Sequence, residues 1–268
     1  MGGVRRDNDT VLNSVSSGIR KISIEINLDI SVLRLKVAIE SADEDFAAAL
    51  KIRYSRFTVD SFGSDYHPVR LKLEAGSGYS GSISTKETRT GWNITGRGID
   101  VEHSDSSTCG SIFPDIHILD SLFRIICSRL LVAKGGILIH AAGIEGDVYT
   151  GPAGSGKTTS VRDRDDMLGD DIIALKKEKG GWYIYSTPFT GEFEGRVMKR
   201  NEKLERLYLL SMPEGKLGKT ELMRGILKNT LYFFSDKDSH ERLMEYSEDL
   251  ASGIPGYGAL KEHLKRVI

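Results

Sequence analysis

Short segments in which apolar and polar positions alternate dominate the first 110 residues. In residues 21–27, for example, Ile22, Ile24 and Ile26 alternate with polar side chains. A period of two is typical of half-buried strands, and β-branched residues favour the same structure. The other segments of this kind are residues 33–40, 52–59 and 69–75. We therefore expect residues 1–110 to form a β-rich N-terminal region.

Two parts of this region depart from the strand pattern. Residues 44–51 (EDFAAALK) are rich in alanine, which favours a short helix. The stretch from Gly76 to Thr108 is rich in Gly, Ser and Thr, which predicts hairpins or exposed loops.

The apolar period changes to that of a helix after Pro114 and Asp115. Apolar residues then recur at helical spacing, and glycines at 135 and 136 supply a stop. These apolar residues are Leu119, Leu122, Phe123, Ile126, Leu130 and Leu131. The pattern predicts an amphipathic helix.

A β-hairpin is expected directly after this helix. The apolar runs 137–140 and 148–150 are separated by the turn-forming sequence Glu-Gly-Asp at 145–147. A glycine-rich loop and a short helix follow, and further strands and helices complete the chain. We expect strands at 172–175, 182–185 and 204–210, and helices near 220–234 and 239–251. This order predicts an α/β fold with antiparallel hairpins in a mixed sheet, and a second domain over residues 111–268.

Composition and charge exclude several classes of protein. The chain has 37 Lys and Arg against 38 Asp and Glu, so it lacks the basic balance of a general nucleic-acid binder. Its two cysteines have no metal-type spacing, which is typical of a reducing compartment. No apolar run approaches the roughly 20 residues that span a bilayer, and the start of the chain lacks the apolar core of a signal peptide. We expect a cytoplasmic protein with neither nucleic-acid nor membrane partners.

A phosphate-binding motif lies between the hairpin and the short helix. Residues 151–158 read GPAGSGKT and satisfy the pattern G-x-x-x-x-G-K-[S/T] between a strand and a helix. Glycines let the backbone curl so that N–H groups point at phosphate oxygens. Lys157 would balance charge on the β- and γ-phosphates, and the Thr158 hydroxyl would hold Mg²⁺. The expected nucleotide-binding residues of this loop are Gly151, Ala153, Gly154, Ser155, Gly156, Lys157, Thr158 and Thr159. The alternative is a flexible Gly/Ser surface loop, which the strand-helix context disfavours.

An acidic pair, Asp170 and Asp171, follows after one short helix and precedes the apolar run IIAL. Carboxylates at a strand end beside a phosphate loop can bind Mg²⁺ or accept the proton of an attacking hydroxyl. The alternative is that this Gly-Asp-Asp sequence is a turn between a helix and a strand.

The runs GGILIHAAGI, VYTGPAGSGKTT, LGDDII and TPFTGEFEG together resemble the catalytic domain of bacterial HPr kinase/phosphorylase and its related kinases. The resemblance covers roughly residue 115 to the C-terminus. It implies a phosphoenolpyruvate-carboxykinase-like P-loop kinase core and phosphoryl transfer from ATP, or sometimes another phosphate donor, to a serine hydroxyl with Mg²⁺. The short interval between Lys157 and Asp171 predicts a truncated helix after the loop.

The same resemblance assigns roles to individual residues. His140, Lys157, Thr158 and Asp171 correspond to the active centre, with Thr158 as a metal ligand and Asp171 as the base. Asp170 would support the metal or the charge balance. For His140, the alternative is a histidine that is satisfied within the sheet edge.

The segment TPFTGEFEG contains the nearest candidates for a further metal-binding acid, Glu192 and Glu194. Both could equally be solvated loop acids. A basic stretch follows, and Arg196 is its best candidate for binding phosphate because a guanidinium can contact two phosphate oxygens. Its other members are Lys199, Arg200, Lys203 and Arg206, and such a run is more commonly a solvated face.

Two functions remain open at this point. The first is an ATP- and Mg²⁺-dependent phosphotransferase whose acceptor is a serine-type hydroxyl of a small protein, a peptide such as a lasso-peptide precursor, or free serine. The second is a nucleotide-binding regulatory or assembly protein with little or no kinase chemistry. ATP hydrolysis coupled to movement is a weaker third alternative, and homo-oligomerisation stays open.

Overall fold

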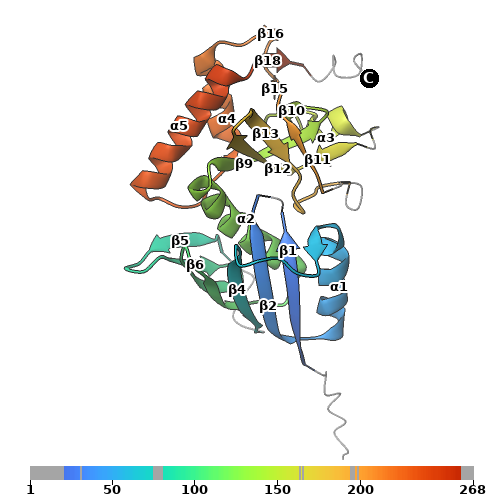
Figure 1. The fold of residues 1–268 in the computed structure, drawn as a ribbon, viewed down its shortest axis with the longest axis vertical. Helices are drawn as coiled ribbons and strands as arrows, with labels where there is room; N and C mark the ends of the chain where they lie inside the picture. The colour runs from blue at the N-terminus through green and yellow to red at the C-terminus, as the bar shows by residue number, and fades with distance from the viewer. Residues whose placement is uncertain are drawn as a thin grey trace, which may run out of the picture.

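The computed structural model describes residues 21–30, 32–74, 81–162, 164, 166–193, 197 and 199–260. These residues form a mixed α/β fold with two mixed β-sheets of eight and ten strands. One sheet belongs to the N-terminal part and the other to the C-terminal part, and helix α2 (Ile116–Ala133) lies between them (Figure 1).

The N-terminal sheet has the strand order β3-β1-β2-β4-β8-β7-β6-β5. The strands are β1 (Ile22–Asp29), β2 (Arg34–Ala42), β3 (Thr58–Val59), β4 (His67–Leu73), β5 (Ser84–Glu87), β6 (Trp92–Gly96), β7 (Ile99–His103) and β8 (Thr108–Ile112). Strand β4 pairs parallel with β2 and β8, and the other pairs are antiparallel. Strand β8 therefore crosses the boundary expected at residue 110.

The strand expected over residues 52–59 is wrong for most of its length. Helix α1 (Glu44–Tyr54) continues through this segment, and a 3₁₀ turn (Ser55–Phe57) follows it. The Asp43 side chain caps the helix by accepting a hydrogen bond from the Phe46 amide at 2.8 Å. Leu50 and Tyr54, four residues apart, are both buried, so the helical period decides the structure.

The C-terminal sheet has the order β14-β13-β12-β9-β10-β15-β18-β16. The strands are β9 (Gly136–Ile144), β10 (Asp147–Thr150), β12 (Ile172–Glu178), β13 (Gly181–Tyr185), β14 (Asn201–Lys203), β15 (Arg206–Leu210), β16 (Gly215–Lys216) and β18 (Gly256–Ala259). Two short strands, β11 (Met167–Gly169) and β17 (Thr230–Leu231), also pair with β9. The predicted hairpin is confirmed, with Glu145 and Gly146 at positive φ in its turn.

The C-terminal sheet has helices on both faces. Helices α4 (Lys219–Asn229) and α5 (Lys237–Gly253) share a buried cluster with Ile137 and Ile139 of β9. The alternate residues Leu138 and Ala142 pack with α2 on the opposite face. Helix α3 (Lys157–Val161) has five residues, so the truncated helix is confirmed. Among the described residues, no helix is both long enough and apolar enough to cross a bilayer.

One hydrophobic core connects the two sheets through α2. Its members include Leu35 and Val69 of the N-terminal sheet, Leu122 of α2, and Ala142 and Ala174 of the C-terminal sheet. Helix α2 is therefore a shared structural element of both parts.

We predict that replacing Leu122 by Ala lowers the stability of both sheets together. Leu122 is fully buried in the shared core, and such a truncation destabilises by about 2–5 kcal/mol. Trp92 and Trp182 lie in the N-terminal and C-terminal sheets respectively, so Trp92→Phe and Trp182→Phe backgrounds each report on one sheet. In urea denaturation followed by tryptophan fluorescence, Leu122→Ala should lower the unfolding midpoint equally in the two backgrounds. A lower midpoint in only one background would contradict a shared core.

Candidate functional site

The middle of strand β9 is where its neighbours change. On one side β12 pairs with residues up to His140, whereas β11 pairs with Gly143 and Ile144. On the other side β10 pairs with Ala141 to Ile144, and β17 pairs with Leu138 and Ile139. The phosphate loop follows β10, whose last residue pairs with Ala141. The acidic pair precedes β12, whose first residue pairs with His140. The phosphate loop and the acidic pair therefore both lie next to His140 in the sheet.

The phosphate loop has the backbone conformation that its glycines allow. Gly154 and Gly156 have φ of 75° and 104°, where a side chain would be strained. A Cβ on Gly151 would lie 2.9 Å from the Ser155 side-chain oxygen and 3.0 Å from the carbonyl oxygen of Leu210, so a side chain there would force Ser155 and β15 to shift. The Ser155 hydroxyl is buried beneath the loop with no hydrogen-bond partner among the described residues.

Lys157 begins helix α3 and is buried against the loop. Its Nζ donates hydrogen bonds to the carbonyl oxygens of Gly151 at 2.8 Å and Pro152 at 3.1 Å. Burial lowers the pKa of Lys157, and the nearby Asp171 carboxylate opposes that shift. The ammonium group is thus held at the loop as a source of positive charge.

Asp171 lies between two basic side chains. His140 Nε2 is 2.8 Å from its Oδ1, and an Arg124 nitrogen is 3.3 Å from its Oδ2. Burial by itself would raise the pKa of Asp171, but the hydrogen bond from His140 and the charges of Arg124, His140 and Lys157 hold it below its usual value. Asp171 is therefore an oriented carboxylate that is ionised at neutral pH.

Asp170 is held by the loop that follows β13. Its Oδ1 accepts a hydrogen bond from the Gly191 amide, and its Oδ2 accepts one from the Phe193 amide, both at 3.0 Å. The residue is 2% exposed. These two amides fix the carboxylate plane, so the two neighbouring aspartates have separate supports.

One cavity of about 440 Å³ brings most of the predicted residues together. Its lining residues are His140, Ala153, Gly154, Gly156, Lys157, Thr158, Thr159, Arg162, Asp170, Asp171, Gly191 and Glu192. Gly151 and Ser155 belong to the loop but do not line this cavity. Glu194 and Arg196 lie outside the described residues.

The oxygen donors of this cavity fit a magnesium ion. Mg²⁺ prefers carboxylate and hydroxyl oxygens beside substrate phosphates, and Thr158, Asp170 and Glu192 supply such oxygens. Glu192 is mostly exposed, and its carboxylate lies 3.4 Å from Arg162. No cluster of three or more acidic, histidine or cysteine side chains among the described residues could hold a metal by itself. Phosphate oxygens and water would therefore have to complete the coordination.

Sequence reasoning missed Arg124, Arg162 and Gly191. For Arg124 a signal existed, because polar residues recur at 120, 124 and 128 on a helix that is otherwise mostly apolar. A polar row of this spacing on a buried helix indicates a face that contacts other polar groups.

The basic stretch after residue 196 does not converge on this cavity in the part that the structure describes. Lys199 lies 2.9 Å from Asp29 of β1.

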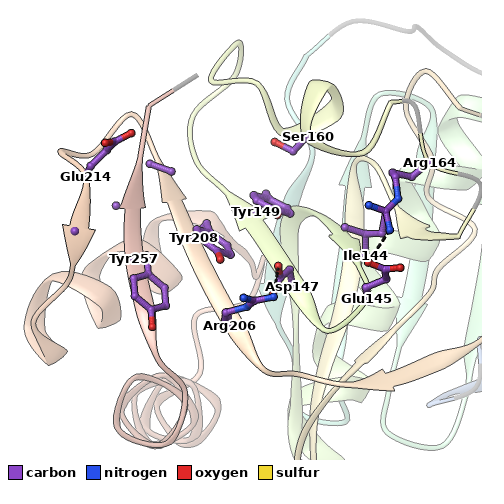
Figure 2. A pocket seen from close by; sticks show the side chains of 13 residues that line it. Ile144, Glu145, Asp147, Tyr149, Ser160, Arg164, Arg206, Tyr208, Glu214 and Tyr257 are labelled. Carbon is purple, nitrogen blue, oxygen red and sulfur yellow. Dashed lines mark hydrogen bonds and ion pairs between the residues drawn. The ribbon is translucent and has the colours of Figure 1, made fainter. Parts of the chain in front are cut away.

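Arg206 donates two hydrogen bonds to Asp147 in a second cavity of about 440 Å³, seen in Figure 2. There Tyr149, Tyr208 and Tyr257 stack in a row across β10, β15 and β18, with ring centroids 4.9 and 5.6 Å apart. None of the described residues that line this second cavity lines the first.

No protein-family model and no curated protein matches the sequence at a significant level. The resemblance to the HPr kinase/phosphorylase family therefore stays a prediction.

We predict that Arg124→Met raises the pKa of Asp171, because the substitution removes one of the positive charges that lower it. The carboxyl ¹³C resonance of Asp171, assigned by its loss in Asp171→Asn, should titrate at higher pH in the variant than in the wild type. Lys134→Met is the matched control, since Lys134 follows the same helix but pairs with Asp65. Equal midpoints in Arg124→Met and wild type would contradict this electrostatic assignment.

Proposed function

We propose that the chain is an ATP- and Mg²⁺-dependent phosphotransferase whose acceptor is a serine-type hydroxyl. The observation that carries the proposal is the single cavity that joins the phosphate loop to the hydrogen-bonded pair of Asp171 and His140. On this proposal the C-terminal part is a phosphoenolpyruvate-carboxykinase-like P-loop core of the stand-alone HPr-kinase-related type.

The donor phosphates would be bound by the loop. The backbone amides of the loop and the Lys157 ammonium group neutralise the β- and γ-phosphates. Thr158, Asp170 and Glu192 would hold Mg²⁺, which when bound supplies further neutralisation of phosphate charge. Catalysis in this reaction class consists mainly of positioning and charge stabilisation.

Asp171 would act on the acceptor. Its carboxylate accepts the proton of the hydroxyl as the hydroxyl oxygen forms a bond to the γ-phosphorus, and the bond from that phosphorus to the β,γ-bridging oxygen breaks. The nucleoside diphosphate leaves with the bridging oxygen. The contact of His140 Nε2 with Asp171 Oδ1, at 2.8 Å, orients the carboxylate. Because the carboxylate is planar, this contact also fixes the position of Oδ2.

As the acceptor we propose a small protein, a peptide or free serine that presents one hydroxyl to Asp171, which is what the resemblance to the HPr-kinase-related proteins implies. The two cysteines, Cys109 and Cys127, are free thiols, and ATP is an intracellular donor, so we place the reaction in the cytoplasm.

A nucleotide-binding regulatory role is the second candidate. It is favoured by the short helix α3, which has five residues after the phosphate loop. The two functions differ in turnover, which the following variants measure.

We predict that Lys157→Ala removes phosphoryl transfer and weakens ATP binding. Loss of one preorganised charge-stabilising group typically lowers turnover by about 10²–10³-fold. Binding of a fluorescent ATP analogue and transfer of labelled phosphate to free serine and candidate peptides measure the two effects. Lys179→Ala removes an exposed lysine in the turn between β12 and β13 and serves as the control. Normal transfer by Lys157→Ala would refute the assignment of the phosphate site.

We predict that Asp171→Asn preserves ATP binding but lowers turnover by about 10²–10⁴-fold, the range for loss of general-base catalysis. The amide keeps the size of the side chain and removes its ability to accept the hydroxyl proton. Near-wild-type transfer by this variant would make the base assignment wrong. Tight ATP binding by the wild type with no phosphorylated product from serine or any peptide would favour the regulatory alternative.

A further inference from the structure

The N-terminal part reaches the candidate site through Arg53, near the end of α1. The Arg53 guanidinium donates to Asp120 Oδ2 of α2, at 2.5 and 3.1 Å. It also donates to the Thr190 side-chain oxygen at 3.1 Å and to the Thr190 carbonyl oxygen at 3.5 Å. One side chain therefore joins α1 to α2 and to the loop after β13.

The Thr190 branch leads to Asp170. Thr190 directly precedes Gly191, and the amides of Gly191 and Phe193 hold the two carboxylate oxygens of Asp170. Any displacement of Thr190 moves the donors that orient this aspartate.

The Asp120 branch leads to Asp171. Asp120 and Arg124 are four residues apart on α2, so they lie on one face of the helix, and Arg124 contacts Asp171. The Arg124 guanidinium also packs over the Phe189 ring, 5.6 Å from its centroid, which connects α2 to the same loop. Asp170 is thus connected to Arg53 through Thr190 and the loop amides, and Asp171 is connected to it through Arg124, one turn of α2 and Asp120.

Burial makes this arrangement specific. Asp120 is 5% exposed, and it also accepts a hydrogen bond from the Tyr54 hydroxyl. A buried ion pair contributes little net stability relative to an apolar pair, whereas its directional bonds fix relative positions.

A second contact, between Asp29 of β1 and Lys199, holds the far end of the same loop region. Figure 1 shows the β1–β2 hairpin reaching toward the second sheet.

We infer that Arg53 is a positioning residue for the two aspartates, and that the N-terminal part is a component of the phosphotransfer site. The role in transfer rests on the proposed function, whereas the bracing of the loop does not. Arg53 touches neither donor nor acceptor, so it acts through Thr190 and Asp120.

The test compares Thr190→Val, Arg53→Lys and the control Lys51→Gln in the full chain. Thr190→Val removes only the side-chain bond to Arg53 and keeps the Asp120 contacts. Arg53→Lys keeps the charge but cannot bridge both partners. Lys51→Gln removes an exposed charge from the same helical turn.

Hydrogen exchange of the Gly191 and Phe193 amides should become roughly tenfold faster in Thr190→Val and Arg53→Lys, the ratio expected for loss of one hydrogen bond to a charged group. In the same variants kcat for transfer should fall by about tenfold, while the Kd for the ATP analogue changes less than about twofold. Lys51→Gln should match the wild type in all three measurements.

Two results would overturn the inference. Unchanged exchange of both amides would show that Arg53 does not brace the loop, and faster exchange with an unchanged kcat would show that bracing has no role in transfer. If the wild type phosphorylates no acceptor, the proposed function fails, and the exchange measurement still decides whether Arg53 holds the loop.

Discussion

The candidate site depends on the way in which strand β9 is hydrogen-bonded, because no neighbouring strand pairs with its whole length. On each side one partner ends and another begins near His140. Backbone groups must find partners elsewhere at such a point, and here the Ala141 amide donates to the Asp171 carbonyl oxygen at 2.9 Å. The interruption lets the phosphate loop and the acidic pair leave the sheet on either side of one histidine.

The charges at this point then set the chemistry. A carboxylate with a lowered pKa contributes stability above its unfolded-state pKa, near 4, and that contribution is lost as pH falls through the lower folded-state value. The pairing of Asp171 with His140 and Arg124 therefore stabilises the fold at neutral pH and keeps the carboxylate ionised, which is the state that a general base needs. The same lowered pKa makes the carboxylate a weaker base, so here the stability of the pairing reduces proton affinity.

Much of this arrangement was predictable from local sequence, and the rest depends on distant contacts. The hairpin turn at Glu145 and Gly146, helix α2 and the short α3 follow from turn chemistry, apolar period and the interval before Asp171. The helix expected to reach residue 234 ends at Asn229, so its last part is wrong, and residues 230–231 form strand β17 instead. The pairing of β17 with β9 is a tertiary contact that no apolar period marks. The same reason applies to the supports of the acids. Arg124 and Asp171 are 47 residues apart, and Arg53 and Thr190 are 137 apart.

Helix α2 explains why such distant residues meet. Its apolar faces pack against both sheets, so the helix is buried on most sides, and polar residues on it must find partners within the protein. Asp120 meets this requirement with Arg53 and Tyr54. One terminal nitrogen of Arg124 meets it with Asp171, whereas Arg124 Nε has no hydrogen-bond partner among the described residues. Apolar residues at these positions would satisfy packing equally well, because a buried ion pair gives little net stability. The directional bonds therefore specify how the N-terminal sheet, α2 and the two aspartates are placed relative to one another, which packing alone leaves loosely defined.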